Sequence, residues 1–269
     1  MFEITGHYIN VNGLRTYYEE AGSGQPVVCL AMAGASGSQY HVLLETCARE
    51  NRRLIAPDLP GRGKTLPPLD TLKPIEDTRE YLDFIWAFIK AMKLEKPVLL
   101  GQAMTAGAVL LLAKEHPDEV AAVVALNGGV QPKAAGDPTY NDLLNHPGVN
   151  LADYKEAHVP GLCGLGVSRE NLNECLWYAA KTQIGDTAVA DSIVFVGMDI
   201  VGRLSGMEMP VLLLRGGSDF TVTEAGRGEI LSLPGAVERL IPGAGHYMAM
   251  EKPEEVAAAV GEFLDSIGR

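Results

Sequence analysis

One segment organises this chain: Pro97-Val-Leu-Leu-Gly-Gln-Ala-Met-Thr-Ala-Gly-Ala-Val-Leu-Leu-Leu-Ala113. Its opening residues, Pro97–Leu100, form an apolar run typical of a buried strand. A turn of small residues follows, and Ala106–Ala113 continues as an apolar run of helical character. Strand, sharp turn and helix in immediate succession predict one repeating unit of an α/β fold, with Ala103 at the tip of the turn.

Strands and helices alternate along the rest of the sequence. His7–Val11 and Arg15–Glu20 flank Asn12-Gly13, a pair typical of a two-residue turn, so they predict an antiparallel hairpin at a sheet edge. Further buried strands are expected at Pro26–Leu30, Arg53–Asp58, Val120–Leu126, Met209–Arg215 and Arg239–Ile241. Helices are expected at Gln39–Glu50, Asp77–Leu94, Asn171–Thr182 and Pro253–Ile267. The alternation predicts an α/β fold with a mostly parallel central sheet and helices on both faces.

Residues 131–209 depart from this pattern. They are richer in polar residues and proline, and they contain no clear strand. A segment of this kind between two strands of one sheet predicts a helical insertion rather than an independent domain. We therefore expect a core formed by residues 1–130 and 210–269, with residues 131–209 as a helical cap, or lid, inserted between them.

The charge balance limits the possible partners. The chain has 22 Lys and Arg residues against 34 Asp and Glu residues, a formal net charge of −12, and no basic cluster. Nucleic acid and anionic membrane surfaces are therefore not expected as partners. The N-terminal residues lack the pattern of a secretory signal, and no apolar run is long enough to span a membrane. The sequence predicts a cytoplasmic protein that acts on a small molecule; it does not predict the oligomeric state.

No metal or cofactor is expected. Cys29, Cys47, Cys163 and Cys175 are widely spaced, which predicts neither a zinc site nor a redox pair, and we expect reduced, structural thiols. The lone Gly-x-Gly at Gly61–Gly63 lacks the continuation of a dinucleotide-binding loop. No flavin signature is present either.

Four segments make the chain similar to the α/β-hydrolase superfamily over essentially its full length. They are Ala56–Lys64, Gly101–Gly107, Gly216–Asp219 and Pro242–His246. Each alone is a weak signal, but their order and spacing together resemble the capped branch of esterases, lactonases and carbon–carbon bond hydrolases. In this superfamily the strand, turn and helix form a nucleophile elbow of the form G-x-S-x-G, which exposes a serine at the edge of the sheet.

The resemblance implies a role for several further residues. Asp219 would orient His246, which would act as general base towards a nucleophile and then as general acid towards the leaving group. The backbone N–H groups of Ala33 and Met104 would form the oxyanion hole. Thr105 stands where the family has a glycine, and its branched side chain is expected to be tight against the neighbouring strand.

Ala103 occupies the position of the nucleophilic serine in this resemblance. Alanine cannot attack a carbonyl, and loss of the serine of a comparable triad costs on the order of 10⁶ in turnover. As a serine hydrolase of a small ester, lactone, amide or C–C bond substrate, the chain is therefore expected to be inactive or severely impaired. Either alanine replaces a serine and silences a hydrolase, or the site does something else. The second possibility includes a lyase, isomerase or decarboxylase that uses Asp219 and His246, or a small-molecule receptor.

The substrate pocket is expected between the elbow and the cap. Candidates for an apolar, partly aromatic lining are Met32, Met104, Trp177, Tyr178 and Tyr247. Trp177 and Tyr178 could equally pack the cap against itself.

Overall fold

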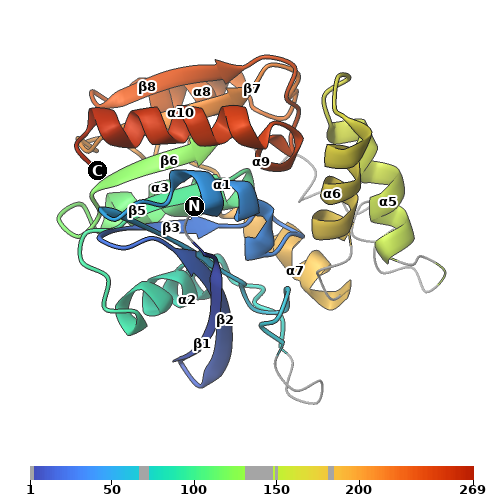
Figure 1. The fold of residues 1–269 in the computed structure, drawn as a ribbon, viewed down its shortest axis with the longest axis horizontal. Coiled ribbons are helices and arrows are strands. Elements are labelled where there is room, and N and C mark those ends of the chain that lie inside the picture. Colours follow the sequence, from blue (N-terminus) through green and yellow to red (C-terminus); the bar gives the residue numbers. More distant parts are fainter. Residues whose placement is uncertain (1–2, 67–72, 131–147, 149–150, 181–184) are drawn as a thin grey trace.

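The computed structural model describes residues 3–66, 73–130, 148, 151–180 and 185–269. Within these residues, eight strands form one sheet in the order β1-β2-β4-β3-β5-β6-β7-β8 (Figure 1). The strands are β1 (Thr5–Val11), β2 (Leu14–Ala21), β3 (Gln25–Leu30), β4 (Arg52–Pro57), β5 (Val98–Gln102), β6 (Ala122–Leu126), β7 (Val211–Gly216) and β8 (Ala236–Ile241). Every pairing from β4 to β8 is parallel, which confirms the predicted fold class.

The predicted hairpin lies at one edge of this sheet. Strands β1 and β2 pair antiparallel, and β2 joins the sheet by an antiparallel pairing with β4. The two turn residues, Asn12 and Gly13, have φ values of 52° and 89°. A two-residue turn with both φ values positive matches the twist of the flanking strands, and Asn-Gly is the pair that adopts it most readily.

Helices cover both faces of the sheet. The described helices are η1 (Gly37–Tyr40), α1 (His41–Cys47), α2 (Thr78–Ala91), α3 (Met104–Glu115), α5 (Leu151–Leu162), α6 (Arg169–Ala180), α7 (Gly185–Val196), α8 (Glu224–Leu231), α9 (Met248–Glu251) and α10 (Pro253–Ser266). In β3, Val28 and Leu30 pack with α2 and α3, whereas Val27 and Cys29 pack with α1 and α10. Burial on both faces explains why the central strands are continuous apolar runs.

The described part of the chain between β6 and β7 contains three helices. Helices α5, α6 and α7 belong to this stretch, and Figure 1 shows α5 and α6 beyond the carboxyl end of β6. Parts of the expected cap, residues 131–147, 149–150 and 181–184, lie outside the described residues. Below, "the insertion" means residues 131–209. No helix in the described ranges is both long and apolar enough to cross a membrane.

The buried sheet predicts a large difference between two Leu-to-Ala substitutions on neighbouring strands. Leu213 in β7 is 0% exposed, whereas Leu240 in β8 is 48% exposed. We expect Leu213→Ala to lower the free energy of unfolding by about 2–5 kcal/mol, because it leaves a cavity in the core. Leu240→Ala should change it by no more than about 0.5 kcal/mol. Urea unfolding followed by circular dichroism measures both, and equal losses would contradict this description of the core.

Candidate active site

The site begins with the sharp turn between β5 and α3. Ala103, between the two elements, has φ 53° and ψ −114°, a region that non-glycine residues rarely occupy. Such a conformation costs on the order of 1–3 kcal/mol and persists only when the surroundings hold it. One restraint is the hydrogen bond of 2.9 Å from Ala103 N to the carbonyl oxygen of Leu126 in β6. The strained turn is therefore present although residue 103 carries only a methyl group.

Thr105 stabilises this turn rather than distorting it. Its Oγ1 accepts a hydrogen bond of 2.9 Å from Gln102 N and lies 2.9 Å from the carbonyl oxygen of Leu30. The hydroxyl thus joins the ends of β3 and β5. The close packing is accommodated by Gly101, because a Cβ there would lie 2.3 Å from the carbonyl oxygen of Thr105.

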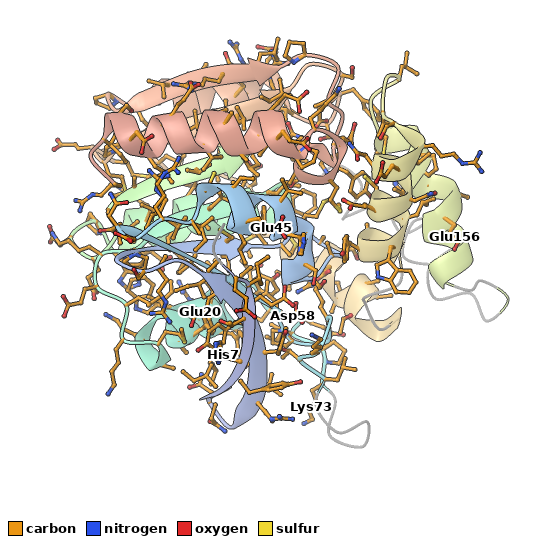
Figure 2. The ribbon with its side chains drawn as sticks, viewed as in Figure 1. His7, Glu20, Glu45, Asp58, Lys73 and Glu156 are labelled. Atoms are coloured by element: carbon orange, nitrogen blue, oxygen red, sulfur yellow. The ribbon has the colours of Figure 1, made fainter. Side chains whose placement is uncertain are left out.

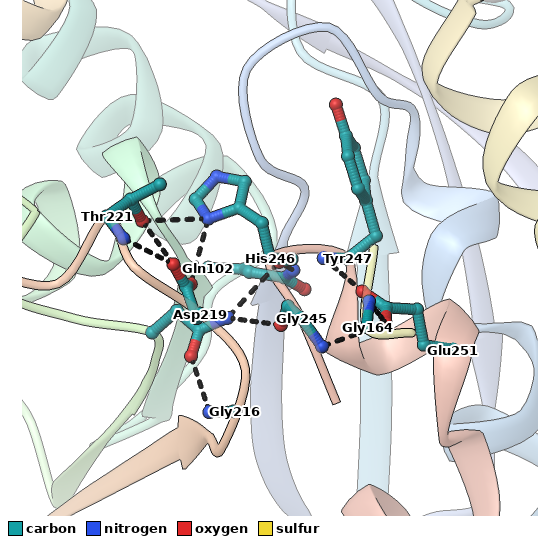
Figure 3. Close-up of polar contacts among 10 residues, drawn as sticks. Gln102, Gly164, Gly216, Asp219, Thr221, Gly245, His246, Tyr247 and Glu251 are labelled. Atoms are coloured by element: carbon teal, nitrogen blue, oxygen red, sulfur yellow. Dashed lines mark hydrogen bonds and ion pairs between the residues drawn. The ribbon is translucent and has the colours of Figure 1, made fainter. Parts of the chain in front are cut away.

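Asp219 and His246 come together at the same edge of the sheet. Asp219 follows β7, His246 follows β8, and their Oδ2 and Nδ1 atoms are 3.0 Å apart (Figure 3). Thr221 joins them: its N–H and hydroxyl each donate to Asp219 Oδ1 at 2.7 Å, and its Oγ1 lies 3.0 Å from His246 Nδ1. The Thr221 hydroxyl donates its proton to Asp219. Asp219 Oδ2 and Thr221 Oγ1 can therefore both accept from Nδ1 when Nδ1 carries the imidazole proton. This tautomer leaves a lone pair on Nε2.

The Asp219 carboxylate is fully buried but well supplied with hydrogen bonds. Burial alone would raise its pKa, but the hydrogen bond and charge of His246, together with the two hydrogen bonds from Thr221, hold the pKa of Asp219 below its ordinary value. The Asp219 carboxylate is thus an acceptor that orients the imidazole of His246 and stabilises the positive charge of its protonated form.

The backbone of His246 is held by three separate elements. Its N–H donates to the carbonyl oxygen of Leu162, at the end of α5, at 2.8 Å. Its carbonyl oxygen accepts from Gln102 Nε2 at 2.6 Å and from Asn127 Nδ2 at 3.2 Å. Gln102 and Asn127, at the ends of β5 and β6, therefore hold the histidine loop to the sheet, and Leu162 joins it to the insertion.

The two expected oxyanion donors lie on either side of the turn. Met104 is the first residue of α3, where N–H groups lack intrahelical partners and the helix dipole favours negative charge. Ala33 lies in the loop after β3. The neighbouring N–H of Met32 donates to Gln39 Oε1 at 3.1 Å, but among the described residues the N–H groups of Ala33 and Met104 meet no acceptor.

An ion pair joins the insertion to the loop that carries Ala33. Asp191 in α7 pairs with Arg62, and both side chains are almost completely buried. Asp191 Oδ2 also accepts from Gly34 N at 3.3 Å, while Arg62 Nη1 donates to the hydroxyl of Tyr81 at 3.3 Å. Burial opposes the charged guanidinium, but the charge of Asp191 raises the pKa of Arg62 above its ordinary value. No pattern in the sequence indicates this contact.

The glycines of Gly61–Gly63 serve a packing role. Gly63 has φ +51°, and a Cβ there would lie 2.1 Å from Asp58 Oδ2. Asp58, labelled in Figure 2, is buried and accepts hydrogen bonds from Gly37 N at 2.8 Å and Lys64 N at 2.7 Å. The buried carboxylate therefore holds this loop against the segment that follows β3.

An apolar cluster surrounds Ala103. Met32 and Tyr247 are buried in it, and Tyr178 packs against it while partly exposed. Trp177 is 62% exposed and lies outside the cluster in the described part of the chain.

The insertion supplies further residues near the site that the sequence analysis did not assign to it. Val159 and Cys175 are both buried in the cluster around Ala103. His158, next to Val159, has its pKa lowered by desolvation and by the positive charge of His246, which indicates a second histidine near the site. In the described residues, no three His, Cys, Asp or Glu side chains are grouped so that they could hold a metal ion.

Comparisons with known proteins identify the family of the chain. The sequence matches the model of the alpha/beta hydrolase family over residues 27–259. It is 27% identical to a 2-hydroxy-6-oxo-6-(2'-aminophenyl)hexa-2,4-dienoic acid hydrolase of Metapseudomonas resinovorans, over 96% of this chain and 90% of that protein. It is 26% identical to a putative 2-succinyl-6-hydroxy-2,4-cyclohexadiene-1-carboxylate synthase of Bacillus subtilis, over 93% of each. The fold is shared with the enol-lactonase of Burkholderia xenovorans, with a TM-score of 0.83, 18% identity, and coverage of 96% and 100% of the two chains.

The strained turn predicts opposite responses to two Ala-to-Gly substitutions. Ala103→Gly should leave the free energy of unfolding unchanged or raise it by about 1 kcal/mol, because glycine tolerates the positive φ. Ala108→Gly, in the interior of α3, should lower it by about 1 kcal/mol. Urea unfolding measures both, and a loss at position 103 as large as that at 108 would show that the turn is not strained.

The low pKa of Asp219 predicts an acid-dependent stability difference. A carboxyl whose pKa is lowered on folding contributes stability above its unfolded pKa, and this contribution is lost as the pH falls through the folded value. The difference in unfolding free energy between the unmutated protein and Asp219→Asn should therefore be constant above about pH 5 and shrink in acid. Exposed Asp118→Asn is the control. A difference that stays constant down to the acid transition would contradict the lowered pKa.

Proposed function

Because the chain belongs to the alpha/beta hydrolase family, we propose that its site takes a small organic carbonyl compound: an ester, lactone, amide or C–C bond substrate. Asp219 and His246 are its acid–base pair, and Ala103 stands in place of the nucleophile. The observation that carries this proposal is the complete hydrogen-bond network of Asp219, Thr221 and His246 beside the strained turn at Ala103.

The chemistry follows from the atoms available. With a serine at position 103, His246 Nε2 would take the hydroxyl proton as the serine oxygen attacked the carbonyl carbon. The N–H groups of Ala33 and Met104 would receive the negative oxygen of the tetrahedral intermediate. Protonated His246 would then give its proton to the leaving group. The methyl group of Ala103 has no lone pair, so the chain as it stands does not form a covalent intermediate.

We assign the insertion, residues 131–209, as a cap over a core of residues 1–130 and 210–269. The contacts of Leu162 with His246 and of Asp191 with Gly34 support this assignment, because they bring the insertion to both sides of the site. Met32, Tyr178 and Tyr247 give the substrate an apolar surface. Trp177, exposed in the described structure, is the weakest of the lining candidates. The names of the hydrolase and the enol-lactonase given above agree with a small carbonyl substrate.

A second candidate function is proton transfer without a covalent intermediate, as in a lyase, isomerase or decarboxylase. The intact pair of Asp219 and His246 favours it, because the pair is fully assembled although residue 103 offers no oxygen. A receptor that binds a small molecule without turnover has no such need for an oriented imidazole.

Substitution of Ala103 separates these possibilities. We expect Ala103→Ser to gain turnover of small esters, lactones or 1,3-diketones by several orders of magnitude, since loss of such a serine costs about 10⁶. It should also be labelled by a serine-directed phosphonate. The unmutated protein and Ala108→Ser should show neither activity nor labelling, and Ala103→Ser combined with His246→Ala should lose both.

Other outcomes would favour the alternatives. If the unmutated protein already turns over a compound and His246→Ala abolishes that reaction, the result supports proton transfer without a covalent intermediate. If a folded Ala103→Ser is neither labelled nor active on the panel, the hydrolase proposal fails. Ligand binding that is unchanged in His246→Ala would then favour a receptor.

A further inference from the structure

A buried carboxylate outside the proposed catalytic pair contacts the histidine loop. Glu251, the last residue of α9, is 1% exposed. Its Oε2 accepts hydrogen bonds from Gly164 N at 2.7 Å and Gly245 N at 2.8 Å, and its Oε1 accepts from Tyr247 N at 2.8 Å (Figure 3). Two of the three donors flank His246 in sequence, and the third belongs to the insertion.

The reach of this carboxylate follows from the short helix that carries it. Tyr247 is the N-cap residue that precedes α9, and Glu251 N donates to the carbonyl oxygen of Tyr247 at 3.0 Å. Glu251 therefore lies one turn after Tyr247, so its side chain can return to the N–H groups at the start of the helix. Bonds of this kind, from backbone N–H groups to a charged acceptor, offset the cost of burying a carboxylate.

The loop and the insertion meet backbone to backbone at this point. A Cβ at Gly245 would lie 2.4 Å from the carbonyl oxygen of Leu162, and a Cβ at Gly164 would lie 1.9 Å from the carbonyl oxygen of Gly243. No side chain could be added at either glycine without a shift of the chain. The Glu251 carboxylate bridges the two segments from the side, beside the direct hydrogen bond from His246 N to Leu162 O.

We propose that Glu251 is a positioning residue: it joins the histidine loop to the insertion and thereby fixes the imidazole of His246 relative to Asp219 and residue 103. With Glu251 in place, the N–H groups of Gly245, His246 and Tyr247 all have acceptors, and the carbonyl oxygen of His246 is held by Gln102. The position of the ring then follows from the backbone. The proposal rests on the proposed role of His246 as the acid–base group.

Glu251→Gln tests it with a minimal change of shape. If the amide oxygen takes the place of Oε1, the NH₂ group faces the N–H groups of Gly164 and Gly245; if it takes the place of Oε2, the NH₂ group faces Tyr247 N. In both orientations at least one donor faces another donor. Glu254→Gln, on the exposed face of α10, is the matched control.

The first measurement is independent of turnover. Proton NMR of the ¹⁵N-histidine-labelled protein should show the low-field Nδ1 proton of His246, identified by its loss in Asp219→Asn. We expect this resonance to shift or broaden in Glu251→Gln and to stay unchanged in Glu254→Gln. An unchanged resonance in a folded Glu251→Gln protein would overturn the proposal.

The second measurement is kinetic and uses the Ala103→Ser background. Adding Glu251→Gln should lower kcat by about 10- to 100-fold while KM changes little, because the carboxylate bonds, among the described residues, to backbone N–H groups beside His246 and to no side chain of the lining. Loss confined to KM would overturn the proposal. If Ala103→Ser has no turnover, the proposed function fails, and the NMR measurement still decides the role of Glu251.

If Glu251→Gln does not fold, hydrogen exchange of the unmutated protein decides instead. The amides of Gly164, Gly245 and Tyr247 should exchange slowly, as partners of a buried acceptor. Fast exchange of Gly245 and Tyr247 would overturn the proposal.

Discussion

The positive φ of Ala103 is the constraint on which the rest of the site depends. It turns the chain from β5 into α3 within one residue, so that Met104 N–H lies at the start of the helix. The turn is held by groups from three strands: Leu126 O in β6, Leu30 O in β3 through Thr105, and the close approach that Gly101 permits. Because these restraints are backbone contacts and a threonine hydroxyl, they do not require a serine at position 103. The geometry of the turn is therefore compatible with the alanine that stands at position 103.

Much of this architecture was predictable from the sequence because its signals are local. Strands buried on both faces are continuous apolar runs, and Asn12-Gly13 indicates its own turn, so the hairpin and the parallel sheet were confirmed. The order of the segments ending at Asp219 and His246 placed both residues at strand ends, where the structure brings them within 3.0 Å. Their catalytic role remains a prediction.

The remaining contacts depend on residues that are distant in sequence. Arg62 and Asp191 are 129 positions apart, and neither lies in a pattern that indicates the other. The one-turn helix α9 is too short to have a periodicity, so Glu251 carries no signal of its three backbone partners. Trp177 and Tyr178 are adjacent aromatic residues, and only their placement in space shows that one packs against the cluster around Ala103 while the other is exposed.

The buried ion pair of Arg62 and Asp191 has a consequence for how such proteins can diversify. Exchange of the insertion for one that has no carboxylate at the position of Asp191 would leave the guanidinium of Arg62 in the core without a partner. Breaking a buried pair from one side costs about 3–5 kcal/mol, a large part of the stability of a typical domain. In chimaeras of this chain, the residue at position 62 and helix α7 should therefore come from the same parent protein. The choice of segment to exchange in this chain therefore depends on the buried charge of Arg62 as well as on where the segment begins and ends.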